Sequence, residues 1–218
     1  MQEKELFIKA LKDLRSSSKK RNFNQSVDLI ILLKNLDLKK AENKKEFFVT
    51  LPREIDKKVK VCAFVGPETY EEAKKNCDLA ILQEEFDSYA KNPRKMKKLA
   101  RDYDWFIAQA NIMPQVASAF GKVLAPRGKM PNPKAGCIFP PKASLKPIVE
   151  KLRKTVKISI KKAPMVQVRV GTESMKDEDI IENIIHVFES VLHNLPNEKN
   201  NIKSVLLKFT MSAPVKVM

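Results

Sequence analysis

The chain has 218 residues, enough for one large domain or two small ones with real hydrophobic cores. Its 42 basic and 26 acidic residues give a formal net charge of +16, which exceeds what solubility requires and is typical of nucleic-acid-binding proteins. Neither a bilayer-spanning apolar run nor the apolar region of a signal peptide is present, so we expect an intracellular protein without a membrane partner. A surface kept soluble by charge and an anionic membrane surface are the competing interpretations of the charge.

The three cysteines are an odd number without a close pair, which fits neither a disulfide framework nor a zinc site. We expect Cys62, Cys77 and Cys137 to be reduced, with Cys62 and Cys137 as small buried hydrophobes. We expect no metal and no cofactor.

The chain begins with an alternation of helix and strand signals. Apolar residues recur at helical spacing over 4–15, which predicts an amphipathic helix. The run FNQSVDLIILLK over 23–34 is apolar enough for a buried strand, and EFFVTLP over 46–52 predicts a second strand that stops at Pro52.

From residue 59 onward a strand pattern is followed by a helix pattern three times, which favours parallel βα units in a layered sheet. The predicted strands cover 59–66, 79–82 and 105–110, and the predicted helices cover 68–75, 84–103 and 112–124. We expect one long helix over 84–103.

The stretch 121–147 holds 3 of the 5 glycines and 6 of the 13 prolines, so we expect a long shaped loop. Between residues 122 and 162 there are 12 Lys or Arg and 1 acidic residue. The loop is either a structural lid over the central domain or a phosphate-contacting loop that presents Arg127, Lys129 and Lys134.

The last third returns to alternating strands and an amphipathic helix. A helix over 144–155 leads into strands over 156–160 and 165–171, then a helix over 177–195 and a strand over 204–210. Both ends of the chain therefore predict α+β structure with a one-sided sheet, whereas the middle predicts α/β structure. The simplest arrangement is an insertion, with residues 1–54 and 156–218 forming one domain and residues 55–155 forming another.

Enzyme motifs are weak in this sequence. The turn from Gly66 to Thr69 has one of the three glycines that a pyrophosphate site needs and places Glu68 where phosphate would bind. His186 and His193 lie seven positions apart on one predicted helix, and we interpret them as buried or rim histidines. We therefore predict no catalysis; the alternative is a nucleotide-dependent transferase built on the central α/β block.

Several segments together resemble a known family. They are KRNFNQSVDLIILLKNLD, the pair LP at 51–52, GKVLAPRGKMPNPKAG, VEKLRKTVKI, VRVG followed by MKDED, and KFTMSAPVKV, and they span nearly the whole chain in order. In these segments the chain resembles the universal large-subunit ribosomal protein L-one family, the mobile side-stalk proteins, and most closely their archaeal and eukaryotic branch.

The resemblance implies an α/β fold of two domains: a discontinuous split α+β sandwich, whose antiparallel sheet carries helices on one face, and an inserted Rossmann-like three-layer domain that binds no dinucleotide. It implies a cytoplasmic, ribosome-bound protein whose partners are large-subunit rRNA, exit-site tRNA during release of deacylated tRNA, and its own mRNA, which relatives repress. A messenger-binding repressor without a ribosomal role is the third alternative. We expect the free protein to be a monomer.

The resemblance also assigns an RNA surface to the terminal pieces. It includes Phe23, Ser26, Asp28, Gly171, Thr210 and Met211, to which polarity and strand face add Arg21, Lys157, Gln167 and Arg169. Phe23 either stacks on a base or packs against the protein. Ser212 also belongs to this predicted surface, although it stands where the family has glycine and a left-handed backbone there would strain a serine.

Overall fold

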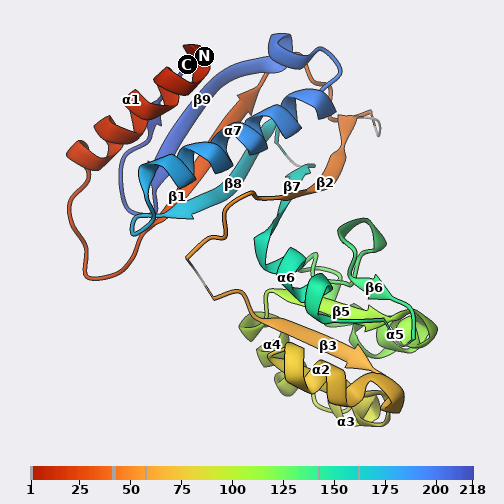
Figure 1. The fold of residues 1–218 in the computed structure, drawn as a ribbon. Coiled ribbons are helices and arrows are strands. Elements are labelled where there is room, and N and C mark those ends of the chain that lie inside the picture. Colours follow the sequence, from red (N-terminus) through yellow and green to blue (C-terminus); the bar gives the residue numbers. More distant parts are fainter. Residues whose placement is uncertain (1, 41–42, 57, 142, 162) are drawn as a thin grey trace. The chain divides into compact units, whose positions relative to one another are not determined.

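The computed structural model describes residues 2–40, 43–56, 58–141, 143–161 and 163–218. The chain divides into two compact units, which we call unit 1 (Met1–Lys57 with Lys154–Met218) and unit 2 (Lys58–Arg153). Figure 1 shows helices and strands mixed in both units, so the predicted α/β class is confirmed.

Unit 1 contains a four-stranded antiparallel sheet in the order β10-β9-β1-β8. Its elements are α1 (Gln2–Ser17), β1 (Ser26–Leu33), β2 (Lys45–Thr50), β7 (Thr155–Ile160), β8 (Met165–Thr172), α7 (Asp177–Asn194), β9 (Ile202–Phe209) and β10 (Val215–Lys216). The strands β2 and β7 form a separate two-stranded sheet. Because β1 lies between β8 and β9, segments from both ends of the chain build one sheet.

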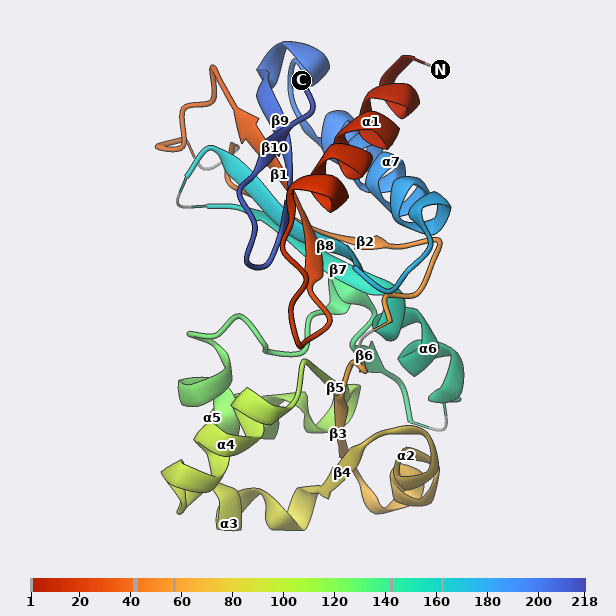
Figure 2. The same ribbon diagram turned by 90° about the vertical axis from the view of Figure 1, so that its left-hand side faces the viewer.

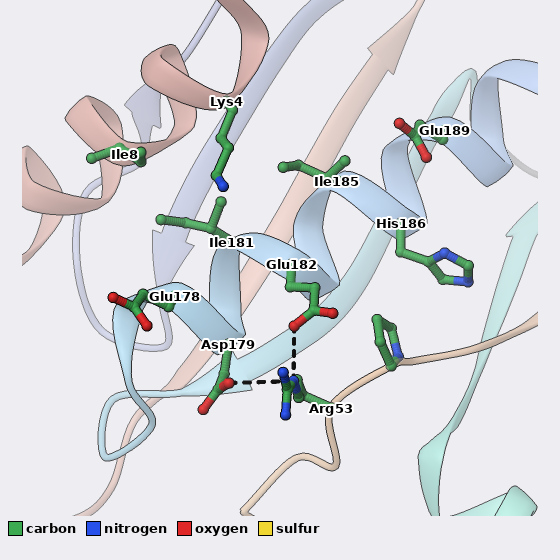
Figure 3. A pocket seen from close by; sticks show the side chains of 11 residues that line it. Lys4, Ile8, Arg53, Glu178, Asp179, Ile181, Glu182, Ile185, His186 and Glu189 are labelled. Atoms are coloured by element: carbon green, nitrogen blue, oxygen red, sulfur yellow. Dashed lines mark hydrogen bonds and ion pairs between the residues drawn. The ribbon is translucent and has the colours of Figure 1, made fainter. Parts of the chain in front are cut away.

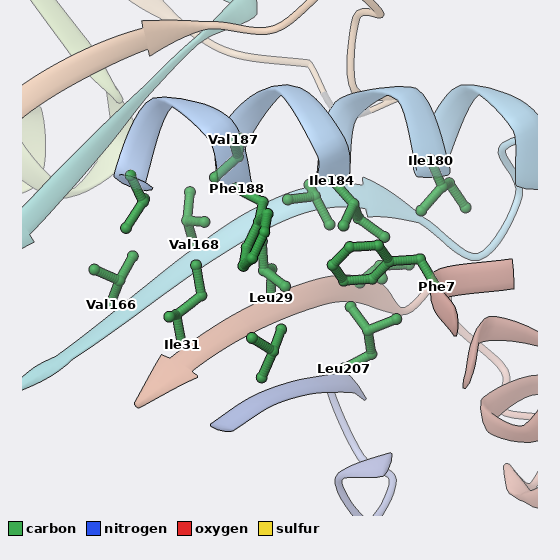
Figure 4. Close-up of a cluster of buried hydrophobic side chains, with 14 of the residues drawn as sticks. Phe7, Leu29, Ile31, Val166, Val168, Ile180, Ile184, Val187, Phe188 and Leu207 are labelled. Carbon is green, nitrogen blue, oxygen red and sulfur yellow. The ribbon is translucent and has the colours of Figure 1, made fainter. Parts of the chain in front are cut away.

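The core of unit 1 lies between this sheet and two helices. Leu29, Ile31, Val168 and Leu207 alternate along their strands with less buried residues and face α7 and α1 (Figure 4). Phe7 of α1 meets Phe188 of α7 edge to face, with ring centroids 5.7 Å apart. One sheet face is thus buried under helices and the other is left open.

Unit 2 contains a four-stranded parallel sheet in the order β4-β3-β5-β6. Its elements are β3 (Val61–Val65), α2 (Tyr70–Asn76), β4 (Leu79–Leu82), α3 (Phe86–Ala90), α4 (Pro93–Asp102), β5 (Trp105–Gln109), α5 (Met113–Leu124), β6 (Ile138–Phe139) and α6 (Lys146–Lys154). Figure 2 shows α3, α4 and α5 on one side of the sheet and α2 and α6 on the other. The parallel βα units expected from the sequence are confirmed.

Aromatic side chains fill the core between the sheet and α3, α4 and α5. Phe64 of β3 stacks on Phe106 with ring centroids 5.8 Å apart and meets Phe86 and Phe120 at 5.7 and 4.7 Å. Cys62 and Cys137 are buried, as predicted, and burial raises the pKa of the Cys137 thiol to about 11.

Two expectations about unit 2 were wrong. The single helix expected over 84–103 is broken, because Pro93 begins α4 and the Asn92 side chain accepts a hydrogen bond from the Lys95 N–H as its N-cap. The loop over 121–147 also contains a short strand, β6, which pairs with β5. Two residues are too short a strand for a sequence pattern to reveal.

Candidate nucleic-acid interface

One end of the unit 1 sheet collects the residues that the family resemblance selects. Because β1 runs antiparallel to both β8 and β9, the beginning of β1 lies beside the ends of the other two strands. We call residues 21–28, 167–174 and 208–212 the polar end of the sheet. It contains Phe23, Ser26, Asp28, Gly171, Thr210 and Met211.

Hydrogen bonds hold these three segments together. Ser26 N–H donates to the Thr210 hydroxyl at 3.0 Å, and Thr210 N–H donates to the Ser26 carbonyl at 3.2 Å. The buried amide of Gln25 donates to the Glu173 carboxylate at 3.2 Å and accepts from Met211 N–H at 3.2 Å. Gln25 therefore fixes the segment after β9 relative to the segment after β8.

Apolar side chains are exposed at this end of the sheet. Phe23 is 50% exposed and Met211 is 60% exposed, although large apolar side chains usually face the core. Within the described residues the only other exposed large apolar side chain is Leu6, at 43%, on α1. The exposure of Phe23 fits a ring that stacks on a partner better than a ring that packs internally.

Three charged side chains lie side by side on the open face of the sheet, near the beginning of β1 and the ends of β8 and β9. Asp28 lies between Arg169 of β8 and Lys208 of β9 in the register of the sheet. Burial raises the pKa of the Asp28 carboxyl, although Arg169 and Lys208 lower it. Arg169 Nε is a buried nitrogen that no hydrogen-bond partner reaches within the described residues. A buried donor without a hydrogen-bond acceptor costs free energy of folding, so a further acceptor group would stabilise it.

The remaining residues of the polar end have varied environments. Arg21 and Gln167 are exposed. Gly171 is buried, and a Cβ at its position would lie 3.0 Å from Ile180 Cγ1 of α7, so close helix packing explains the glycine. Ser212 does not have a positive φ; its hydroxyl accepts a hydrogen bond from Phe209 N–H at 3.0 Å. Serine is therefore accommodated there without left-handed backbone.

Lys157 lies outside the polar end. It belongs to the two-stranded sheet, where its ammonium lies 2.5 Å from Glu46 Oε1, and Lys161 pairs with the other oxygen of the same carboxylate. Burial would raise the pKa of Glu46, but the hydrogen bonds from Lys157 and Lys161 lower it overall. Lys157 is therefore ion-paired within the protein, in a cluster where two lysines share one carboxylate.

The three cations of the basic loop in unit 2 also differ from one another. Lys129 Nζ donates to the carbonyls of Ala100 and Tyr103 at 3.0 and 2.6 Å, and Arg127 Nη1 donates to the Lys97 carbonyl at 3.1 Å. The Lys129 bonds satisfy carbonyls at the end of α4, whereas the Arg127 bond reaches a carbonyl in the middle of that helix. Lys134 is exposed.

Sequence reasoning missed three residues that organise the polar end. Lys208 could have been found, because it alternates with the buried Leu207 and Phe209 and so had to face Asp28. Gln25 and Arg15 carry no such signal.

Arg15 of α1 braces the turn between β8 and α7. Its guanidinium donates to Asp177 Oδ1 at 2.8 Å and to the carbonyls of Glu173 and Met175 at 3.0 and 3.1 Å. Glu173 in turn accepts the Gln25 hydrogen bond at the polar end. Contacts between segments this distant in sequence leave no local pattern, which is why the role of Arg15 was not predicted.

The helix-covered side of unit 1 has the opposite charge character. A groove of 730 Å³ runs between α1, α7 and the Pro52–Arg53 segment. Four acids, two cations and one histidine line it with apolar residues: Lys4, Ile8, Pro52, Arg53, Glu178, Asp179, Ile181, Glu182, Ile185, His186 and Glu189 (Figure 3). Arg53 Nε pairs with Glu182 at 2.8 Å and with Asp179 at 3.4 Å. The acids disfavour phosphate here and leave the open sheet face as the candidate interface.

The hydrogen-bond donors of the glycine turn after β3 are satisfied by a side chain of the same protein. Gly66 N–H donates to Gln109 Oε1 at 2.9 Å, and the Thr69 hydroxyl donates to the same oxygen at 3.2 Å. A phosphate would need these donors. Gln109 is buried, so the turn offers no ready nucleotide site.

The described residues contain neither a cluster of metal-ligand side chains nor a membrane-spanning helix. No His, Cys, Asp and Glu side chains gather there in a group of three or more that could hold a metal ion. None of the helices in that part of the chain is both long and apolar enough to cross a membrane.

Comparison with known proteins identifies the class to which this fold belongs, that of ribosomal proteins. A family model described as "Ribosomal protein L1p/L10e family" matches residues 14–213. The protein called "Large ribosomal subunit protein uL1" from Pyrococcus abyssi is 41% identical over 216 residues, which cover 99% of this chain and 96% of that protein. Its namesakes from Thermococcus kodakarensis and Methanothermobacter thermautotrophicus are 39% and 41% identical, covering 99% and 97% of this chain and 98% of each relative. The chain belongs to the ribosomal protein L1p/L10e family, and these similar relatives are archaeal.

Proposed function

We propose that the protein is a structural constituent of the large ribosomal subunit and binds ribosomal RNA through the polar end of the sheet. Family membership and the names of relatives that align over nearly the whole chain support the ribosomal role. The net charge of +16 supports a polyanionic partner. None of the relatives named above is described as an enzyme.

The single observation that carries the proposal is the exposure of Phe23 and Met211 beside hydroxyl and backbone groups at one end of a basic sheet. An exposed ring can stack on an unpaired base, and hydroxyls and amides can bond ribose and phosphate. Arg169 and Lys208 supply positive charge on the adjoining open face. Asp28, held between them, can accept a hydrogen bond from a ribose 2′-hydroxyl.

The finer functional assignment rests on the family resemblance. We place the protein in the cytoplasmic ribosome, on the mobile side stalk, where it assists release of deacylated tRNA from the exit site. We also propose that it represses translation of its own mRNA, because a messenger that presents the same RNA shape would bind the same surface.

We assign RNA binding to a split α+β sandwich of residues 1–54 and 156–218, with residues 55–155 as an inserted Rossmann-like domain. The compact units described above support this division to within a few residues at each boundary.

The test compares two exposed apolar side chains. Phe23→Ala should weaken binding to large-subunit rRNA by roughly tenfold, because base stacking contributes about 1–3 kcal/mol. Leu6→Ala removes a comparably exposed side chain from α1 and should leave the affinity unchanged. Filter binding at several salt concentrations measures both variants.

Sedimentation gives the ribosomal readout. The wild-type protein should travel with large subunits, whereas a repressor without a ribosomal role would remain at the top of the gradient. Equal affinities for the Phe23 and Leu6 variants would remove the polar end from the RNA interface.

A further inference from the structure

We propose that unit 2 carries a second RNA-binding surface, on α4, that contacts the phosphates of double-stranded RNA. Its residues are Arg94, Lys97, Lys98 and Arg101, which we call the α4 stripe. All four side chains are exposed. The stripe is separate from the polar end of the sheet, which belongs to unit 1.

Helix geometry gathers these four cations on one face. Positions i, i+3, i+4 and i+7 of a helix share a side, and a rise of 1.5 Å per residue makes the stripe about 10 Å long. The opposite side of α4 is buried through Met96, Leu99 and Ala100, so packing in unit 2 fixes which face is exposed.

The stripe is electrostatically unfavourable for the isolated protein. Like charges three and four positions apart destabilise a helix, and the α4 stripe contains four such pairs. Asp102 is the only acid in α4, and within the described residues it forms the only ion pair with the stripe, at 3.3 Å from Arg101. Cations near the first turn also oppose the helix dipole. A polyanion bound along the stripe would compensate all of these effects.

Neighbouring cations contact other groups of the protein, and we therefore do not count them in the stripe. Lys95 Nζ lies 4.0 Å from the centroid of the Tyr89 ring. Lys129 donates to carbonyls at the end of α4, as described above. The exposed Arg127 donates to the Lys97 carbonyl, so its positive charge lies beside the stripe.

The surroundings of the stripe favour duplex RNA over single strands. Within the described residues the exposed large apolar side chains all belong to unit 1, so no exposed aromatic ring accompanies the stripe for stacking on unpaired bases. A stripe of about 10 Å matches roughly three phosphates along one strand, spaced as in a duplex. Double-stranded RNA is recognised mainly through such backbone contacts.

The test uses the full chain and an RNA duplex of about 16 base pairs without bulges. Fluorescence anisotropy over a range of KCl concentrations compares wild type with the variant Arg94→Gln, Lys97→Gln, Lys98→Gln and Arg101→Gln. The affinity should fall by at least about tenfold, and the slope of log affinity against log salt should decrease by about three.

A control variant removes the same charge elsewhere in unit 2. Lys74→Gln, Lys75→Gln, Lys146→Gln and Lys151→Gln change exposed lysines of α2 and α6, which lie on the other side of the sheet from α4 (Figure 2). This variant should lose much less duplex affinity than the stripe variant. Equal losses would overturn the proposal, because net charge alone would then explain the binding.

Two further measurements test the electrostatic argument and distinguish failure of this proposal from failure of the proposed function. The thermal midpoint of the stripe variant should equal or exceed that of wild type, because like-charge repulsion is relieved; a lower midpoint would contradict the electrostatic argument. Phe23→Ala reports on the polar end of the sheet independently of α4. If Phe23→Ala loses rRNA binding while the stripe variant binds the duplex as well as wild type does, the α4 stripe is not an RNA-binding surface. The proposal for the polar end of the sheet would then still stand.

Discussion

Two arginines of unit 1 show how differently the two sides of its sheet use positive charge. Arg53, at the groove beside α7, pairs with Asp179 and Glu182, and the hydrogen bond to Glu182 is the main reason that its pKa is raised. Arg169, on the open face, has a buried Nε without a hydrogen-bond partner among the described residues. The first arginine is paired by its own chain, whereas the second keeps a buried donor that no partner among the described residues satisfies.

Replacing each arginine in turn tests this difference and should give the largest effect on rRNA binding. Arg169→Gln should weaken rRNA binding by about 10- to 100-fold, because a charge-assisted hydrogen bond contributes about 1.5–3 kcal/mol. Arg53→Gln should leave the affinity unchanged, since exposed ion pairs contribute only about 0–1 kcal/mol to stability. Filter binding measures both, and equal effects would remove the distinction between the two faces.

Gly171 connects the two faces, because its backbone belongs to the polar end while its missing side chain makes room for α7. Gly171→Ala would place a Cβ 3.0 Å from Ile180 Cγ1, so we expect the free energy of unfolding to fall by about 1–2 kcal/mol. Urea denaturation measures this change. Ile180→Ala removes Cγ1, so in that background Gly171→Ala should cost less than it does in the wild type; strictly additive losses would show that the contact is not the cause.

Thr210 tests the hydrogen bonding of the polar end. Thr210→Val removes the acceptor for Ser26 N–H, so rRNA affinity should fall several-fold, equivalent to about 0.5–1.5 kcal/mol for one hydrogen bond. Thr210→Ser keeps the hydroxyl and is the matched control. If serine and valine bind alike, the hydroxyl has no part in RNA recognition.

Asp28 gives the smallest expected effect, through pH. Burial raises its pKa above the ordinary value of 3.8, although Arg169 and Lys208 oppose the shift. The folded state therefore holds this proton more tightly than the unfolded state, and the free energy of unfolding decreases as pH rises through the Asp28 pKa. At neutral pH Asp28→Asn should be slightly more stable than wild type, with the gain disappearing in acid. Urea denaturation from pH 3 to 7 measures it, and a gain that grows in acid would contradict the raised pKa.

Much of the fold could be predicted because its signals are local. Alternation along 165–171 and 204–210 and helical spacing over 177–195 each reflect one buried face, and the repeated strand–helix pattern over 59–124 predicted the parallel sheet of unit 2. The break at Pro93 was missed because the helical signals on both sides were strong. Proline at the first position of a new helix continues that pattern while ending the hydrogen-bond ladder.

The candidate site was predictable only in part, for a related reason. Phe23, Thr210 and Met211 came from motif resemblance, whereas Gln25 is defined by contacts with segments distant in sequence. Lys129 shows what composition leaves out: its charge suggested phosphate binding, and its ammonium donates to carbonyls at the end of α4. Composition counts charges, and only geometry distinguishes a charge used internally from one left over.

The placement of β1 between β8 and β9 also has a consequence for biogenesis. Ser26 and Thr210, hydrogen-bonded neighbours at the polar end, are separated by 184 positions in the chain. A nascent polypeptide therefore lacks part of this surface until almost all of it has been translated. Truncated products would expose an unfinished sheet with reduced capacity to compete with the mature protein for its target.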